Sequence, residues 1–275
     1  TEMYNIDGNV TTNSGFAETD ATLWGTPAIG DLKGTGEMQI VVGSRTGSPN
    51  KILCYSVKDE NNDHLPDLLW QRDVNASYDR GLVLANLDNS PDGSLEIVAL
   101  GCEGGDLRTL DADGNDLYQF GNFNTYGIPA VADLDGDGDM EIVIGDRYGG
   151  LYVWHHNGRN FRSNPFFSIP DKSYWLCSSP TICDLDNDGE KEIIIVAKKD
   201  VGNSELTSTA RIYAFKLNGT FVPGWNGTQE YPIPNRSYSR DITVGDIDGD
   251  GNLEVVALCR NGVRVWDNVG RLITN

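Results

Sequence analysis

Short apolar runs recur along the chain, separated by acidic or glycine-rich turns. The runs AVA and EIVIG flank one such turn, and the run LYVWH follows shortly afterwards. β-Branched and aromatic residues dominate these runs, and no window has the i, i+3, i+4, i+7 apolar spacing of an amphipathic helix. Asp-Gly or Asn-Gly pairs at 113–114, 157–158 and 218–219 are typical of hairpin turns. The pattern predicts an all-β chain of antiparallel hairpins.

One unit, made of an apolar run, an acidic loop and a β-branched run, occurs five times. The clear copies are PAVADLDGDGDMEIVIG, PTICDLDNDGEKEIIIV and ITVGDIDGDGNLEVVAL, and the weaker ones are PAIGDLKGTGEMQIVVG and LVLANLDNSPDGSLEIVALG. The loops start near residues 31, 88, 133, 184 and 246, and each interval has room for four strands. Repeats of about 40–55 residues that form four-stranded antiparallel units are typical of β-propeller blades.

The sequence therefore predicts one β-propeller domain over residues 1–275, with five visible blades. Five blades could close into a ring, with the N-terminal segment supplying the outer strand of the last blade. The alternative is that they form part of a ring of six to eight blades.

Acidic side chains stand at alternate positions in the three clear loops. Like charges so close together repel one another unless a cation lies between them. Calcium takes six to eight oxygen ligands, and an EF-hand would place its glutamate twelfth between helices, whereas here it stands ninth between strands. We predict three calcium sites, formed by Asp133, Asp135, Asp137, Asp139 and Glu141; by Asp184, Asp186, Asp188, Glu190 and Glu192; and by Asp246, Asp248, Asp250, Asn252 and Glu254.

The two weaker loops differ from this pattern. Counting back from Glu96 predicts a fourth, weaker calcium site, whereas an alternative register starts at Asn86 and needs a two-residue insertion. In the first loop, Lys33 is expected to replace the missing cation. The ligands of the fourth site would be Asp88, Ser90, Asp92, Ser94 and Glu96, whereas the first loop has Lys33, Thr35 and Gln39 at ligand positions.

Composition narrows the function. A net charge of −20 argues against nucleic-acid binding, and no apolar run is long enough to insert into a membrane. The cysteines lie mostly in apolar strands and are expected to be buried thiols, with a Cys177–Cys183 bridge as an alternative. No G-x-S-x-G, H-E-x-x-H or P-loop motif is present, so binding is favoured over catalysis.

The motifs DLDGDGDMEIVIG, DLDNDGEKEIIIV and DIDGDGNLEVVAL resemble the FG-GAP/VCBS repeat family, the blade unit of integrin α-subunit heads and of certain calcium-containing propeller lectins. The resemblance covers essentially the whole chain. It implies a β-propeller with calcium in the loop between the first and second strands of a blade, and an extracellular setting.

Aromatic residues precede the first strands, and cations follow most of the second strands, at the end of the blades opposite the calcium loops. Aromatic rings stack on sugars, and arginine binds carboxylates. These residues could instead pack neighbouring blades and bond loop carbonyls. The candidates for ligand binding are Trp24, Arg45, Tyr78, Tyr126, Arg147, Trp175, Lys198, Tyr238 and Arg260.

We therefore expect an extracellular adhesion or binding module, part of a larger polypeptide, that recognises a glycan or an acidic protein ligand. The alternatives are a polysaccharide-active enzyme of the uronate lyase type and a purely architectural spacer.

Overall fold

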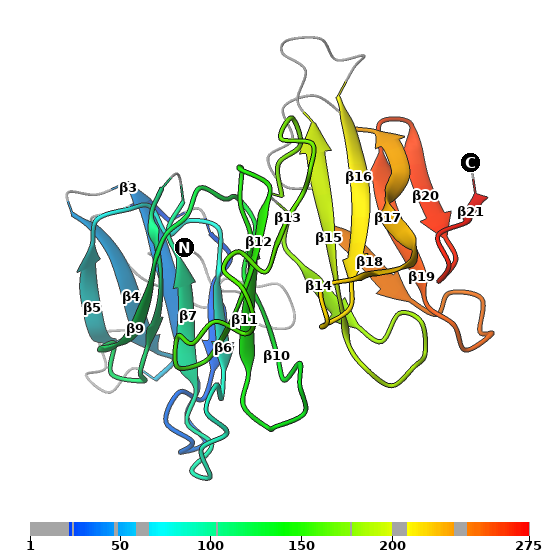
Figure 1. Cartoon of the computed structure of the whole chain (residues 1–275). Coiled ribbons are helices and arrows are strands. Elements are labelled where there is room, and N and C mark those ends of the chain that lie inside the picture. The colour runs from blue at the N-terminus through cyan, green and yellow to red at the C-terminus, as the bar shows by residue number, and fades with distance from the viewer. Residues whose placement is uncertain are drawn as a thin grey trace, which may run out of the picture. The chain divides into compact units, whose positions relative to one another are not determined.

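The computed structural model describes residues 22–23, 25–46, 49–58, 66–102, 104–176, 178–199, 208–233 and 241–274. Every regular element in these ranges is a β-strand (Figure 1). The chain divides into two compact units, residues 1–123 and 124–275, which are described separately.

Unit 1 contains two antiparallel sheets. In the first sheet, β2 pairs with β3, β3 with β4, and β4 with β5, and the short strand β1 also joins β3. Its strands are β1 (Thr22–Leu23), β2 (Ala28–Gly30), β3 (Gln39–Thr46), β4 (Asn50–Ser56) and β5 (Leu68–Val74). The second sheet has the order β6 (Leu82–Ala85), β7 (Glu96–Leu100), β8 (Asp106–Leu110) and β9 (Asp116–Asn122).

Unit 2 contains three antiparallel four-stranded sheets, each in chain order. The third sheet has β10 (Ala130–Ala132), β11 (Glu141–Gly145), β12 (Gly150–His155) and β13 (Phe167–Ser168). The fourth has β14 (Thr181–Cys183), β15 (Glu192–Lys199), β16 (Thr209–Phe215) and β17 (Phe221–Pro232), and the fifth has β18 (Ile242–Gly245), β19 (Glu254–Cys259), β20 (Gly262–Trp266) and β21 (Leu272–Thr274). Strand β21 completes the fifth sheet, so the expectation that the N-terminal segment supplies its outer strand is wrong.

Strand β15 shows why the second strands are apolar on both faces. Successive side chains of a strand point to opposite faces. Ile193 and Ile195 pack into a cluster with side chains of the third sheet, and Ile194 and Val196 pack into another with side chains of the fifth. All four are essentially buried, and each buried side chain of this size contributes about 1.5–3 kcal/mol. The run therefore packs the fourth sheet against both the third and the fifth sheets.

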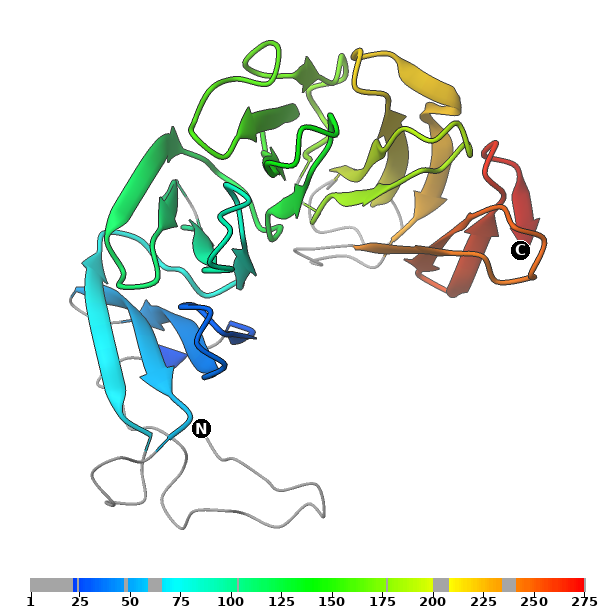
Figure 2. The ribbon, with the colours of Figure 1, turned by 90° about the horizontal axis from the view of Figure 1, so that it is seen from below.

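Within each unit, the sheets pack side by side as propeller blades do. Inner strands β10, β14 and β18 lie next to one another in unit 2, with the later strands of each sheet stepping outward (Figure 2). The predicted hairpin glycines Gly114, Gly158 and Gly219 have positive φ of 80° to 85° in the turns between third and fourth strands. The aromatic residues of the third strands are buried, and they are Tyr55, Trp154, Tyr213 and Trp266. The fold is an all-β propeller.

Candidate functional site

Each second strand begins with a glutamate or glutamine that is buried and bonded to the loop before it. The main-chain N–H of the second loop residue donates to this side chain at 2.7–2.9 Å in all five sheets. The donor and acceptor pairs are Leu32 and Gln39, Leu87 and Glu96, Leu134 and Glu141, Leu185 and Glu192, and Ile247 and Glu254. This shared bond fixes where each loop begins.

The shared bond corrects the register predicted for the second loop. Leu87 and Glu96 are nine positions apart, whereas the equivalent residues of the other loops are seven apart. The loop therefore begins at Asn86 with two inserted residues, and the register that began at Asp88 is wrong. Calcium binding in this loop by Asp88, Ser90, Asp92, Ser94 and Glu96 stays a prediction.

The first aspartate of a loop organises the turn. The carboxylate of Asp246 accepts the main-chain N–H of Gly249 at 2.7 Å and that of Gly251 at 3.0 Å. Asp31 accepts two main-chain N–H groups in the same way, although its loop lacks the other acidic residues. With Gln39 keeping the buried bond, the first turn forms without a carboxylate cluster, so the clusters elsewhere are not needed to shape the turn.

The expectation for Lys33 is wrong. Its Nζ lies 2.6 Å from Asp113 Oδ1, in the hairpin of the neighbouring sheet, and both side chains are more than half exposed. The ammonium therefore does not fill its own loop.

The loop that begins at Asp133 brings three carboxylates together. Single oxygens of Asp133, Asp135 and Glu141 lie within 4.8 Å of one another. Burial raises the pKa of Glu141, the hydrogen bond from Leu134 opposes this, and the charge of Asp135 raises the pKa further. A divalent cation would offset both the burial and the repulsion, so the residues present fit calcium. The fifth loop holds a similar cluster of Asp246, Asp248 and Asp250.

Two histidines approach the third loop, which the sequence did not predict. His155 Nδ1 lies 2.9 Å from Glu141 Oε1, and His156 Nδ1 lies 3.4 Å from Asp139 Oδ2. These two adjacent histidines contact different carboxylates. The contact of His155 could have been predicted from the strand register, because His155 lies opposite Glu141 in the pairing of β11 with β12.

The fourth loop differs from the third because a lysine enters its cluster. Oxygens of Asp184, Asp186 and Glu192 lie within 4.8 Å of one another, and Lys216 Nζ lies 2.6 Å from Asp186 Oδ2. The hydrogen bonds to Asp186 and Asp188 raise the pKa of Lys216 above its ordinary value. This lysine follows β16 and was missed because it lies far from the loop in sequence.

The seventh loop residues contribute to the turn through the main chain. The N–H groups of Asp139, Glu190 and Asn252 each donate to the aspartate two positions earlier, at 3.0, 2.9 and 2.7 Å respectively. Glu190 is exposed, and its side chain lies outside the cluster of the fourth loop. The ligand role predicted for these three residues stays a prediction.

Unit 2 also has a depression of about 740 Å³ at the end of the blades away from these loops. Arg147 Cζ lies 4.4 Å from the ring centroid of Trp175 and 5.6 Å from that of Tyr126. Stacking on two rings holds a guanidinium in place. The lining consists of Asn124, Arg147, Tyr148, Gly150, Tyr152, Pro165, Ser168, Lys172 and Trp175. Three of the predicted ligand-face residues are thus brought together.

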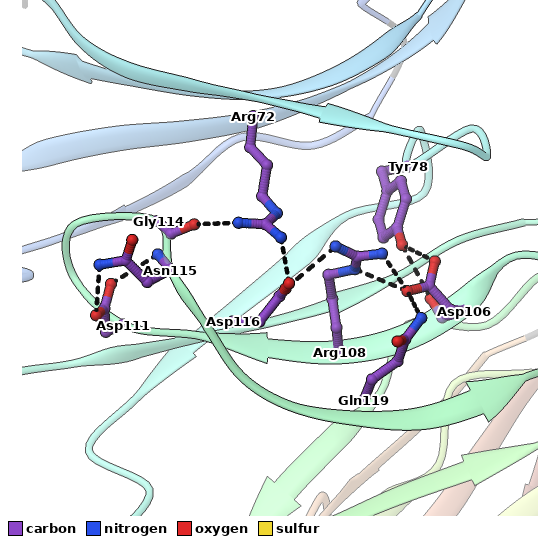
Figure 3. A network of polar contacts seen from close by, with 9 residues as sticks. All are labelled: Arg72, Tyr78, Asp106, Arg108, Asp111, Gly114, Asn115, Asp116 and Gln119. Atoms are coloured by element: carbon purple, nitrogen blue, oxygen red, sulfur yellow. Dashed lines mark hydrogen bonds and ion pairs between the residues drawn. The ribbon is translucent and has the colours of Figure 1, made fainter.

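Tyr78 is not part of a ligand surface. The side chain is fully buried, and its hydroxyl donates to the Asp106 carboxylate, which also binds Arg108 (Figure 3). The prediction that Tyr78 contacts a ligand is therefore wrong, because the ring forms part of the packing between the two sheets of unit 1.

The remaining predicted ligand-face residues make contacts within the protein or lie outside the described residues. Arg45 lies 3.6 Å from Asp79, and Arg260 donates to the Ile233 carbonyl oxygen at 3.1 Å. Lys198 is only 6% exposed. These contacts match the alternative interpretation of the cations as structural. Trp24 and Tyr238 lie outside the described residues.

The described cysteines are free thiols, namely Cys54, Cys102, Cys183 and Cys259. Burial raises the pKa of Cys54, Cys102 and Cys183 to about 12. Cys177, the other half of the alternative bridge, lies outside the described residues. Across the described ranges, no helix is long and apolar enough to span a bilayer.

Comparison with known proteins agrees with the repeat pattern. Residues 133–195 match a family model described as an FG-GAP-like repeat. A segment of 102 residues is 30% identical to cartilage acidic protein 1 of Mus musculus, covering 34% of this chain and 16% of that protein. The chain thus spans about a sixth of the length of the curated relative that it matches.

Two solved structures share the fold. The Vibrio cholerae biofilm matrix protein Bap1 is similar with a TM-score of 0.59 and 20% identity, over 91% of this chain and 39% of Bap1. The Dos1 propeller is similar with a TM-score of 0.51 and 10% identity, over 98% of this chain and 62% of that one. Together with the repeat match and the five sheets, these likenesses show a β-propeller fold that contains an FG-GAP-like repeat.

Proposed function

We propose that the chain is a calcium-stabilised binding module of adhesion type that acts outside the cell, within a larger polypeptide, and binds an anionic glycan at the Arg147 depression. The setting is suggested by the names of the similar proteins, one a cartilage protein and one a biofilm matrix protein. The ligand class is argued from the side chains of the depression.

The observation that carries the ligand class is the Arg147 guanidinium, held between the rings of Tyr126 and Trp175. Its preset position suits bidentate binding of a carboxylate or sulfate, and the exposed Lys172 adds a second cation at the same depression. Tyr148 is 69% exposed and offers a ring face on which a sugar can stack.

A further contact suits a sugar hydroxyl. Asn124 lines the depression, and its buried Oδ1 makes no hydrogen bond within the described protein. A buried acceptor without a partner costs about 1–3 kcal/mol. A ligand hydroxyl that donates to this oxygen would remove the cost, so a polyhydroxylated acid suits the depression better than an acidic peptide does.

Calcium would support the module from the other end of the blades. The turn of the first loop forms with Asp31 and Gln39 alone, so the extra carboxylates in the third and fifth loops call for a cation. When bound, calcium would neutralise these clusters and hold the hairpins that carry them.

Calorimetric titration with size-defined heparin and polygalacturonate oligosaccharides tests the proposal, with neutral dextran as the control ligand. Loss of a charge-assisted hydrogen-bonding group costs about 1.5–3 kcal/mol, so Arg147→Gln should weaken binding about 10- to 100-fold. Tyr148→Ala and Lys172→Gln, both at exposed residues, should each weaken it several-fold.

Arg162→Gln is the matched charge control. This residue is exposed, lies outside the Arg147 depression, and bonds to the Leu217 carbonyl oxygen at 3.1 Å. The proposal fails if Arg162→Gln and Lys172→Gln weaken binding equally, or if neither anionic oligosaccharide binds the wild-type chain. Absorbance of unsaturated products, read in the same samples, would point to the lyase alternative instead.

A further inference from the structure

Lys216 places an ammonium inside the fourth loop. Its Nζ lies 2.6 Å from Asp186 Oδ2, donates to Asp188 Oδ2, and lies 3.7 Å from Glu192 Oε1. These three carboxylates are ligands predicted for calcium in this loop. One side chain of the protein therefore already contacts the anionic oxygens on which a calcium ion would depend.

The carboxylates around Lys216 need a positive charge. Glu192 is fully buried, and its Oε1 has no hydrogen-bond partner among the described residues, nor does the buried Asp186 Oδ1. A buried carboxylate oxygen without a hydrogen bond is costly unless a cation lies nearby. Lys216 is the cation that the chain supplies, with its own side chain only 24% exposed.

The equivalent position in the other blades carries no ammonium. It is the residue opposite the buried glutamate or glutamine, across the second and third strands, as Gln39 pairs with Ser56 and Glu141 with His155. The register of the remaining ladders extends the same position to Asp111 in the second blade, Lys216 in the fourth and Asp267 in the fifth. The fourth blade thus departs from the others at the residue that contacts its cluster.

We propose that the Lys216 ammonium is the resident cation of the fourth loop and replaces calcium there. The chain then binds calcium in the loops that begin at Asp133 and Asp246, as in the proposed function on which this inference rests, but not in the loop that begins at Asp184. A calcium ion held by these oxygens would lie within a few ångströms of the ammonium, and the two positive charges would repel each other, so one cation excludes the other. A cation attached to the chain also stays in place when calcium is scarce.

Calcium stoichiometry of the full chain, measured by calorimetric titration and by elemental analysis after desalting, tests this proposal. Lys216→Met removes the charge while keeping an unbranched apolar stem, and should bind one more calcium ion than the wild type. The melting temperature of Lys216→Met should also rise with calcium by more than that of the wild type.

Two paired variants keep the test decisive even if Lys216→Met does not fold. Asp186→Asn with Asp188→Asn should leave the calcium count of the wild type unchanged, whereas Asp135→Asn with Asp137→Asn should lower it by one. A lower count for the first pair would overturn the proposal, as would a folded Lys216→Met that gains no calcium. If the second pair has no effect, the proposed calcium of the third loop is wrong, which is a separate result.

Discussion

The buried carboxylate of Asp106 offers a sharp test of how the first two blades are held together. It accepts hydrogen bonds from Arg108 Nε and Gln119 Nε2, each at 2.8 Å, and from the Tyr78 hydroxyl (Figure 3). Asp106 and Arg108 are 6% and 8% exposed. Asp106→Asn keeps the shape of the side chain and removes the charge that Arg108 needs.

The expected loss of stability follows from the burial of this pair. Breaking a buried ion pair by removing one partner costs about 3–5 kcal/mol, because the other charge is left buried. Arg108 keeps a second partner, Asp116 Oδ1 at 3.1 Å. Asp106→Asn should therefore lower the free energy of unfolding by about 3 kcal/mol, the low end of that range.

Asp116→Asn is the matched control within the same network. The Asp116 side chain is 43% exposed, and exposed pairs contribute about 0–1 kcal/mol, so this variant should lose less than about 1 kcal/mol. In the double variant Asp106→Asn with Arg108→Met, the buried charge itself is gone, and part of the loss should be recovered.

Urea unfolding, checked by calorimetry, measures these differences. Equal losses for Asp106→Asn and Asp116→Asn would refute the reasoning, because they would mean that burial adds nothing to the pair. The reasoning would also be refuted if the double variant lost as much free energy of unfolding as Asp106→Asn and Arg108→Met lose together when each is made alone.

Three further results are expected. Chelation of calcium should lower the melting temperature, since an ion present at a hundred times its dissociation constant stabilises by about 2.7 kcal/mol, and scanning calorimetry with and without EDTA checks this. Gly145→Ala places a Cβ 2.5 Å from the Leu176 carbonyl oxygen and should destabilise by about 1–3 kcal/mol in urea, whereas Gly245→Ala meets no atom within 4 Å and should be nearly neutral. Burial would raise the pKa of Asp106, but the Tyr78 hydrogen bond and the Arg108 charge lower it below its ordinary value of 3.8. The stability that this carboxylate contributes is therefore present above that pH and is lost on further acidification. Asp106→Asn should accordingly lose less stability than the wild type between about pH 4 and pH 2, as followed by circular dichroism.

Local patterns in the sequence predicted the fold well. The alternation of apolar runs with acidic turns located the second strands, because the glutamate or glutamine that begins each strand also bonds to the loop before it. The same reasoning failed at the second loop, where two inserted residues move the start to Asn86. Counting residues back from Glu96 does not detect this insertion, whereas the hydrogen bond from the Leu87 main-chain N–H to Glu96 shows it.

The site was harder to predict because its decisive contacts join distant segments. Lys33 lies in a loop without a full acidic set and was expected to fill it, yet its ammonium reaches the neighbouring hairpin at Asp113. Lys216 does contact an acidic loop, from a position just after β16 that lies about thirty residues further along the chain. Arg147 and Trp175 lie together in the structure, but the repeat pattern did not distinguish these candidates from the buried Tyr78.

The bond between the second loop residue and the buried Glu or Gln has a consequence for how such chains can change. Gln39 accepts the main-chain N–H of its loop just as Glu141 accepts that of its own loop. The turn therefore keeps its shape whether or not the accepting side chain is charged. In the proposed function, ion binding is then a removable addition to a turn that forms without the ion. A blade would be able to exchange a dissolved ion for a lysine ammonium, or do without either, through a few substitutions in its own loop, and the proposed ion requirement of the domain would be adjustable one blade at a time.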